Sequence, residues 1–315
     1  GSADSALEQS QALNACKLRP FVNVEYNKKR TLSRNLMNYL KLLGLNAVLH
    51  AYIGWRLLPY LSAFPAAVLW LAGLLMVSSL MVPLGLMARQ LARPPLADGL
   101  SWAGLLCMGL FSSLFVLTLL RDAALSLLWL VNFLLPDLLP LAHWRTISAQ
   151  AVPVLGGLVT LMGFLNARRT AAVVRVDVPI KGLPAAWHGF TVAQISDIHV
   201  GPTIKQRYLR RIVERVNSLQ ADVVAITGDL VDGKVSELAV HVAPLADLRS
   251  RHGTFFVTGN HEYYSGANAW INELRRLGLT VLLNEHVVIA RVDAAGEAGW
   301  PLVLAGVTDF NAGHF

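Results

Sequence analysis

The sequence predicts a multi-span α-helical membrane domain followed by an α/β domain of the β-sandwich type, with helices on both faces of its sheet. Three observations predict this fold class. The chain of 315 residues is 54% hydrophobic and only 15% charged, whereas a soluble domain has about 25% charged residues. The apolar residues gather in long uncharged runs before about residue 171. After that point, short β-rich runs alternate with amphipathic helical patterns, which is typical of an α/β sheet.

The net charge is divided between the two halves as unevenly as the hydrophobicity. Residues 1–171 hold 14 Lys and Arg against 6 Asp and Glu, a net charge of +8, whereas residues 172–315 have a net charge of −1. A basic chain often binds nucleic acid, but these basic residues flank apolar segments, as the positive-inside rule describes for membrane proteins. We therefore expect the lipid bilayer as a partner and no nucleic acid.

The predicted membrane domain covers residues 41–171 and follows a basic tail over residues 1–40. A helix needs about 20 apolar residues to cross the hydrocarbon core of a bilayer. Three runs without a charged residue reach that length, namely 66–88, 100–120 and 146–167. They predict three membrane-spanning helices.

Two further apolar runs contain ionisable residues. Residues 42–61 carry Arg56 near their end, where a long side chain can reach the membrane surface, and predict a fourth span. Residues 123–142 contain Asp137 and are consistent with a fifth span, a re-entrant segment or an interfacial helix. Four spans place the basic segments and residues 172–315 on the cytoplasmic side, and a fifth would move the second domain outside. We expect an integral protein of a bacterial inner membrane with a cytoplasmic second domain.

The second domain, residues 172–315, is predicted as an alternation of strands and helices. In chain order, the predicted elements are a strand over 190–196, a helix over 203–219, a strand over 222–227, a helix near 235–250, a strand over 254–258, a helix near 268–277, and strands near 279–283, 286–290 and 301–306. The helix over 203–219 has one apolar and one basic face. A basic face is typical both of a solvated helix and of a surface that meets anionic headgroups.

Polar residues able to bind metal ions follow three consecutive predicted strands. In chain order they are Asp197, His199, Asp229, Asp232, Asn260, His261 and Glu262. Ligands of open α/β sheets bind at the carboxyl ends of the strands, so we expect these side chains to converge. Carboxylate, imidazole and amide oxygen groups suit divalent ions such as Mn, Fe, Zn or Mg. One aspartate between two such ions can bridge them.

These residues resemble the first three motifs of the calcineurin-like metallophosphoesterases. The matching segments are Asp197-x-His199, Gly228-Asp229-x-x-Asp232 and Gly259-Asn260-His261-Glu262. The resemblance covers roughly residues 172–315. The apolar half is similar to the membrane-anchored branch of that superfamily, some members of which resemble UDP-2,3-diacylglucosamine hydrolases, enzymes that cut a pyrophosphate bond in a lipid precursor.

The resemblance implies two divalent metal ions and a ligand for each. Asp197 and His199 would hold the first ion. Asp229 would bridge both ions, and Asn260 would bind the second. The implied chemistry is two-metal phosphoryl transfer, in which the ions activate a water and hold the ester for in-line attack.

The resemblance also implies catalytic roles for two residues that do not bind metal. His261 would face the phosphate and protonate the leaving oxygen, or stabilise its charge, and Asp232 would orient His261. For Glu262 we expect only a role in the local structure.

One part of the family pattern has no counterpart in this sequence. The family continues with a further His and then a Gly-His-x-His motif, and no segment before Phe315 matches either. We therefore interpret the chain as truncated and expect a longer native chain to supply the remaining ligands. For the chain as it stands, weak metal binding and low activity are expected.

The leading functional interpretation is a membrane-anchored, dinuclear-metal phosphoesterase. Its substrate would contain a phosphate ester or pyrophosphate bond and belong to a lipid or a lipid-linked compound. Two alternatives remain open, namely a nucleotide phosphodiesterase whose spans serve only as an anchor, and a non-enzymatic membrane protein with a degenerate phosphoesterase domain. Ionisable residues within membrane spans usually mark a transport path. The predicted spans contain few of them, which argues against a transporter.

Overall fold

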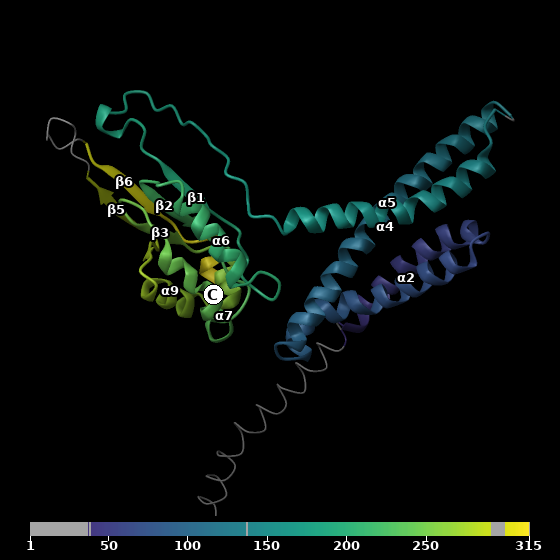
Figure 1. Cartoon of the computed structure of the whole chain (residues 1–315), viewed down its shortest axis with the longest axis horizontal. Coiled ribbons are helices and arrows are strands. Elements are labelled where there is room, and N and C mark those ends of the chain that lie inside the picture. The colour runs from purple at the N-terminus through teal and green to yellow at the C-terminus, as the bar shows by residue number, and fades with distance from the viewer. Residues whose placement is uncertain (1–36, 38, 137, 291–299, 315) are drawn as a thin grey trace, which may run out of the picture. The chain divides into compact units, whose positions relative to one another are not determined.

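The computed structural model describes residues 37, 39–136, 138–290 and 300–314. Contacts between Cα atoms divide the chain into two units, residues 1–165 and residues 166–315 (Figure 1). The predicted basic tail, residues 1–40, lies almost entirely outside the described residues.

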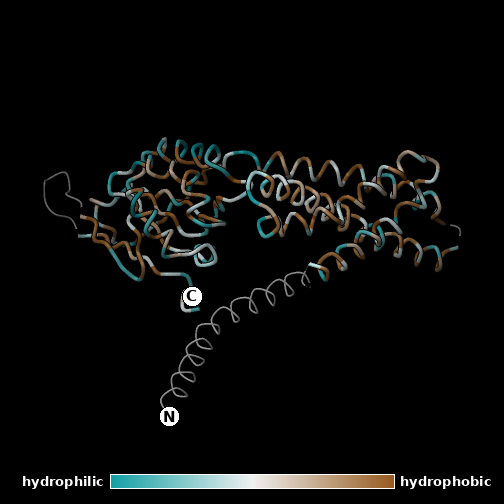
Figure 2. The backbone as a smooth tube through the Cα atoms, turned by 90° about the horizontal axis from the view of Figure 1, so that it is seen from below, coloured by the Kyte–Doolittle hydropathy of each residue, from teal (hydrophilic) through white to brown (hydrophobic). Residues whose placement is uncertain are grey.

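The first unit is built from helices. Residues 39–57 are helical, and the elements that follow are η1 (Leu58–Leu61), α2 (Pro65–Leu86), α3 (Ala88–Leu91), α4 (Leu96–Leu134) and α5 (Leu141–Ala167). Among the described residues, the three helices α2, α4 and α5 are long and apolar enough to cross a membrane. Figure 2 shows hydrophobic residues along these helices, the pattern of helices buried in lipid and against one another. The predicted multi-span helical domain is therefore confirmed.

Helix α4 joins two segments that the sequence suggested as separate elements. Residues 123–134 continue α4 without a break, and Leu141 begins α5. The prediction of a separate element over residues 123–142 is therefore wrong. The physical reason is that residues 96–134 contain no proline, and the charged residues inside the helix find partners on its neighbours.

Asp122 is the centre of a polar cluster between helices of the first unit. Its carboxylate accepts a hydrogen bond from the Tyr52 hydroxyl at 2.6 Å and two from the Arg56 guanidinium at 2.6 and 2.8 Å. The neighbouring Arg121, only 5% exposed, donates to Asp122 at 3.2 Å and to Ser148 Oγ of α5 at 2.9 Å. The sequence placed Arg56 at the end of a span, but it did not indicate these partners.

Substituting Asp122→Ala is expected to destabilise the helical unit by about 3 kcal/mol, because it leaves the buried Arg121 and the partly exposed Arg56 without their counter-charge. Thermal unfolding of the detergent-solubilised protein, followed by far-UV circular dichroism, measures the effect. Ser126→Ala, one helical turn further along α4 at an exposed position, is the control and should unfold like the wild type. Equal melting temperatures for the two variants would show that the cluster contributes nothing to stability.

The second unit contains a parallel sheet and a strand pair. The parallel strands are β1 (Val192–Ile195), β2 (Val223–Thr227), β3 (Thr254–Val257) and β4 (Thr280–Val281), paired in that order. The strands β5 (Glu285–Ile289) and β6 (Leu302–Gly306) pair antiparallel. All six strands lie where the sequence predicts them.

The helices of the second unit are α6 (Gln206–Asn217), α7 (Val235–Val242), α8 (Asn260–Ser265) and α9 (Ala267–Arg276). When parallel strands follow chain order, right-handed crossovers place their helices on one face. Helices α6, α7 and α9 accordingly share a buried core with Ile226 and Phe256. The opposite face, with Val223 and Phe255, packs against the β5–β6 pair (Figure 1). Among the described residues, the predicted sandwich therefore has helices on one face and a second sheet on the other.

Candidate metal centre

The loops after β1 and β2 run side by side at the carboxyl edge of the sheet. The backbone N–H of Asp197 donates to the carbonyl of Gly228 at 3.3 Å, and that of His199 donates to the carbonyl of Asp229 at 3.1 Å. Beyond them, Val200 forms a parallel bridge with Val231. The sheet register thus continues into the loops and brings the first two motifs together.

Three of the four predicted metal ligands have a backbone conformation that is rare for residues other than glycine. Asp197, His199 and Asp229 have φ angles of 55°, 52° and 51°. Each such residue costs of order 1–3 kcal/mol, and such residues cluster at functional sites. The loops are therefore held in a left-handed conformation that points these side chains at one another.

Three of the predicted ligands form one group, and His199 forms a second group with the two predicted catalytic residues. One ligand atom each from Asp197, His199 and Asp229 lies within 4.8 Å of the others, and the same holds for His199, Asp232 and His261. The imidazole of His199 belongs to both groups, because its Nε2 lies 3.9 Å from Asp197 Oδ1 and its Nδ1 lies 3.1 Å from Asp232 Oδ1.

Asn260, the fourth predicted ligand, lies against Asp229. Its terminal amide is 3.1 and 3.2 Å from the two carboxylate oxygens of Asp229, and the amide nitrogen donates to both when it faces them. The backbone N–H of His261 donates to Asp229 Oδ1 at 3.0 Å. The carboxylate of Asp229 therefore contacts the start of α8 and has an oxygen within 4.8 Å of ligand atoms of Asp197 and His199.

Asp232 contacts two imidazoles. Its Oδ1 lies 2.6 Å from Nδ1 of His261 and 3.1 Å from Nδ1 of His199. The contact with His261 is the one that the sequence predicted, whereas the contact with His199 was not foreseen. One carboxylate thus sets the orientation of both rings.

The electrostatic environment of His199 favours positive charge. Burial acts to lower the pKa of His199, but the hydrogen bond that its Nδ1 donates to Asp232 and the charges of Asp232, Asp229 and Asp197 outweigh it and leave the pKa above its ordinary value. In the two groups and Asn260, carboxylates, imidazoles and one amide supply the donor atoms, with no thiol among them. This donor set fits a hard or borderline divalent cation.

Glu262 is the functional residue that the sequence left unassigned. Its side chain is fully buried and accepts hydrogen bonds from the backbone N–H groups of Asp229, Leu230, Val231 and Gly259 at 3.0, 2.8, 3.3 and 2.7 Å. Burial raises the pKa of Glu262, although these four bonds act in the opposite direction.

The position of Glu262 in the sequence contained a usable signal. It is the third residue of α8, where a glutamate commonly accepts a hydrogen bond from the amide of the residue before the helix. Here the same carboxylate also reaches the loop after β2, and so it fixes the second and third motifs relative to each other.

Gly259 stands where any side chain would collide with Asp229. A Cβ atom built on Gly259 overlaps the Asp229 carboxylate. Gly259→Ala is therefore expected to displace Asp229 and to weaken Mn²⁺ binding about tenfold or more, as measured by titration calorimetry. Gly313→Ala serves as the control, because nothing lies within 4 Å of its Cβ. Unchanged affinity in Gly259→Ala would contradict the position assigned to Asp229.

Residues 190–305 match the family model of the calcineurin-like phosphoesterases. The chain is 43% identical over 165 residues to a Bos taurus protein named transmembrane protein with metallophosphoesterase domain, covering 51% of this chain and 37% of that protein. It is 32% identical over 92 residues to the UDP-2,3-diacylglucosamine pyrophosphatase LpxG of Chlamydia muridarum, covering 29% of this chain and 28% of that protein. The chain spans about a third of the length of these curated relatives. No solved structure gives a significant match.

The matched segment contains the three motifs and every candidate residue of the centre. It also contains β1 to β3, whose carboxyl ends position them. Residues 190–305 therefore form a calcineurin-like phosphoesterase domain, as the resemblance of the three strand-end motifs indicated.

Proposed function

We propose that this protein is a membrane-anchored phosphoesterase that uses two divalent metal ions to hydrolyse a phosphate ester or a pyrophosphate bond. The observation that supports this proposal most directly is the convergence of the candidate ligands at the ends of three parallel strands. The ions are of the Mn, Fe, Zn or Mg class. Once bound, they supply an activated water and polarise the phosphoryl oxygens.

The hydrogen bonds around His199 and Asp229 suit the ligand roles proposed for them. Asp232 occupies Nδ1 of His199, so Nε2 is left toward Asp197 at 3.9 Å, the arrangement in which a carboxylate orients a metal-binding imidazole. Asp197 and His199 would hold the first ion. A carboxylate oxygen of Asp229 lies within 4.8 Å of ligand atoms of Asp197 and His199, and the Asn260 amide lies 3.1 and 3.2 Å from the carboxylate of Asp229. This position supports a bridging role for Asp229 and a second ion at Asn260.

His261 is proposed as the general acid for the leaving oxygen. Its Nδ1 is bonded to Asp232 at 2.6 Å, so the proton available to a substrate is the one on Nε2. Asp232 accepts this hydrogen bond and so fixes the orientation of the His261 ring. The imidazole is about one-third exposed, so a substrate can reach it.

The activity is tested with the purified protein in detergent and bis(p-nitrophenyl) phosphate as a generic phosphodiester. We expect hydrolysis that requires Mn²⁺ or a similar ion and stops with a chelator, together with bound metal by elemental analysis. Neither hydrolysis with any divalent ion nor bound metal would overturn the proposal in favour of a non-enzymatic membrane protein.

We further propose that the substrate is a lipid or is linked to one. The domain follows helices able to lie in a membrane, and one relative is named a pyrophosphatase of UDP-2,3-diacylglucosamine. A panel of UDP-linked lipids, phospholipids and cyclic nucleotides, compared by kcat/KM, tests the proposal. Preference for a UDP-linked lipid or a phospholipid supports it, and preference for a cyclic nucleotide identifies a nucleotide phosphodiesterase on a membrane anchor.

The proposed location is a bacterial inner membrane with the phosphoesterase domain in the cytoplasm. The helix over residues 39–57 and the helices α2, α4 and α5 would make four passes. Four passes place Arg89, Arg93, Arg168 and Arg169 on one side, in agreement with the positive-inside rule. Reporter fusions at residue 172 test this orientation, and fusions active only outside the cytoplasm would reverse it.

A further inference from the structure

Helix α6 presents a dense group of positive charges on one side. The group, which we name the α6 basic face, consists of Arg207, Arg210, Arg211 and Arg215 of α6 together with Lys205, the residue directly before the helix. Glu214 is the sole acidic residue of α6. The opposite side of the helix is buried in the core of the second unit through Leu209, Ile212, Val213 and Val216. The apolar side therefore fixes the helix, and the basic side is left at the surface.

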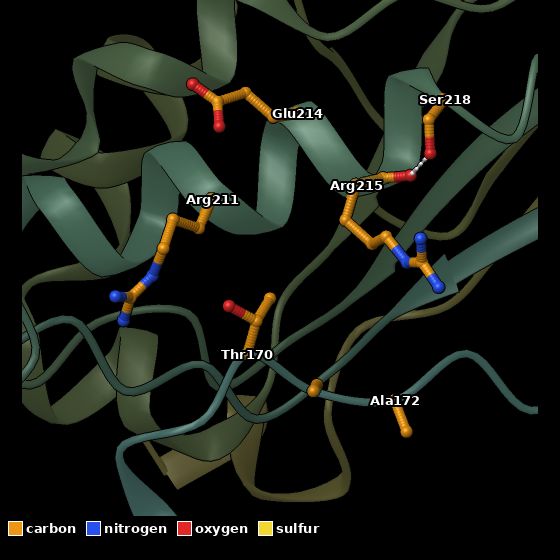
Figure 3. A pocket seen from close by; sticks show the side chains of 7 residues that line it. Thr170, Ala172, Arg211, Glu214, Arg215 and Ser218 are labelled. Carbon is orange, nitrogen blue, oxygen red and sulfur yellow. Dashed lines mark hydrogen bonds between the residues drawn. The ribbon is translucent and has the colours of Figure 1, made fainter.

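The segment that directly follows α5 lies along this basic face. Thr170 and Ala172 form one side of an open hollow of about 530 Å³, and Arg211 and Arg215 of α6 form the other (Figure 3). Figure 3 shows the two arginines on either side of Thr170. Arg211 Nη2 also makes a long hydrogen bond of 3.5 Å to the carbonyl of Arg168. These contacts hold α6 beside the residues that emerge from α5.

Arg211 has unused hydrogen-bonding capacity in this position. Its Nε atom is shielded from solvent and, among the described residues, has no hydrogen-bond partner. A guanidinium group with a free N–H donor favours the binding of an anion that has several oxygen atoms. Phosphate is such an anion, because it can accept hydrogen bonds from two guanidinium nitrogens at once. The hollow is open on its outer side, next to Arg215.

The position of the α6 basic face along the chain identifies the anion. Arg168 is the first residue after α5, and α5 is apolar enough to cross a membrane. The residue that follows such a helix lies at the level of the lipid headgroups. Within the second unit, Arg211 contacts the carbonyl of that residue. We propose that the α6 basic face binds the anionic phospholipid headgroups of the bilayer that contains α5.

Binding of the α6 basic face to lipid does not depend on hydrolysis, but it would affect the position of the candidate metal centre. Helix α6 begins at Gln206, seven residues after His199. A docked α6 would keep the loop after β1 close to the lipid surface. Each basic residue near an anionic surface strengthens such docking about fivefold.

The experiment measures the distance of α6 from the lipid headgroups in the full chain. The protein, with Cys16→Ser and Cys107→Ser, carries a fluorophore on Glu214→Cys of α6 or on Asn272→Cys of α9, an exposed control position. It is placed in nanodiscs of phosphatidylcholine with a headgroup-attached quencher, with or without about a third phosphatidylglycerol. We expect stronger quenching at position 214 when phosphatidylglycerol is present, its loss in high salt, and no change at position 272.

Charge reversal separates lipid binding from misfolding. Arg211→Glu with Arg215→Glu should shift the balance away from the docked state by at least about 25-fold. Arg249→Glu with Arg275→Glu, the same change of charge at exposed positions elsewhere in the unit, should leave quenching unchanged. The milder pair Arg211→Gln with Arg215→Gln should give an intermediate result, and circular dichroism confirms that each variant folds. Equal quenching at position 214 in neutral and anionic nanodiscs overturns the proposal, whether or not the protein hydrolyses phosphodiesters.

Discussion

Asp229→Asn is expected to lower metal-dependent phosphodiester hydrolysis by more than the roughly 10–100-fold that loss of an outer-shell partner costs. The carboxylate of Asp229 contacts the amide of Asn260 and has an oxygen within 4.8 Å of ligand atoms of Asp197 and His199. Asparagine keeps the size of the side chain and an oxygen for the N–H of His261, so the fold should persist. It removes one negative charge and one ligand oxygen from the centre. Initial rates with saturating Mn²⁺ measure the loss.

The matched control for this prediction is Asp247→Asn, at an exposed position in the same domain. It changes the net charge equally and should leave the rate unchanged. Circular dichroism of both variants separates loss of activity from loss of fold. An Asp229→Asn variant with nearly wild-type, metal-dependent activity would exclude a bridging role for Asp229.

Glu262→Ala is expected to have the largest effect on stability of any substitution at the site. It removes one carboxylate that accepts four backbone hydrogen bonds in a buried position. Each buried donor left without a partner costs about 1–3 kcal/mol, so loss of four partners is expected to cost at least about 4 kcal/mol in total. Hydrogen–deuterium exchange of peptides covering residues 228–232 and 258–262 should become faster, and hydrolysis should fall with it.

Two further substitutions make the Glu262 prediction specific. Glu262→Gln retains one acceptor oxygen and should give intermediate exchange rates. Glu285→Ala removes an exposed carboxylate and should leave exchange unchanged in both peptides. Wild-type exchange in Glu262→Ala would show that these loops hold their conformation without the buried carboxylate.

The strands and the candidate site could be predicted from the sequence because each rests on a short-range signal. The run over residues 222–227 is β-rich and is followed directly by Gly228-Asp229. Parallel pairing brings such strand ends together whatever the intervening distance along the chain. The contact between Asp232 and His261 follows from the same reasoning together with the family resemblance.

The remaining features depend on partners that lie far apart in the chain. Glu262 accepts hydrogen bonds from backbone groups about 30 residues away. Nearly every residue type has a backbone N–H group, so the sequence does not indicate which of them donates to Glu262. The pairing of Arg56 with Asp122 joins two helices 66 residues apart. Without that pairing, Arg121 and Asp122 look like the end of a span, which is why one continuous helix was predicted as two elements.

The length of α4 constrains how the chain can thread through a bilayer. Its 39 residues give a helix about 58 Å long, nearly twice the hydrocarbon thickness of about 30 Å. Even at a tilt of about 40° it covers about 45 Å along the membrane normal, so roughly a dozen residues stand outside the hydrocarbon. An unbroken helix makes a single passage however apolar it is. The long apolar stretch from residue 96 to residue 134 therefore contributes one membrane crossing. The number of crossings made by the other helices then decides on which side of the membrane the phosphoesterase domain lies.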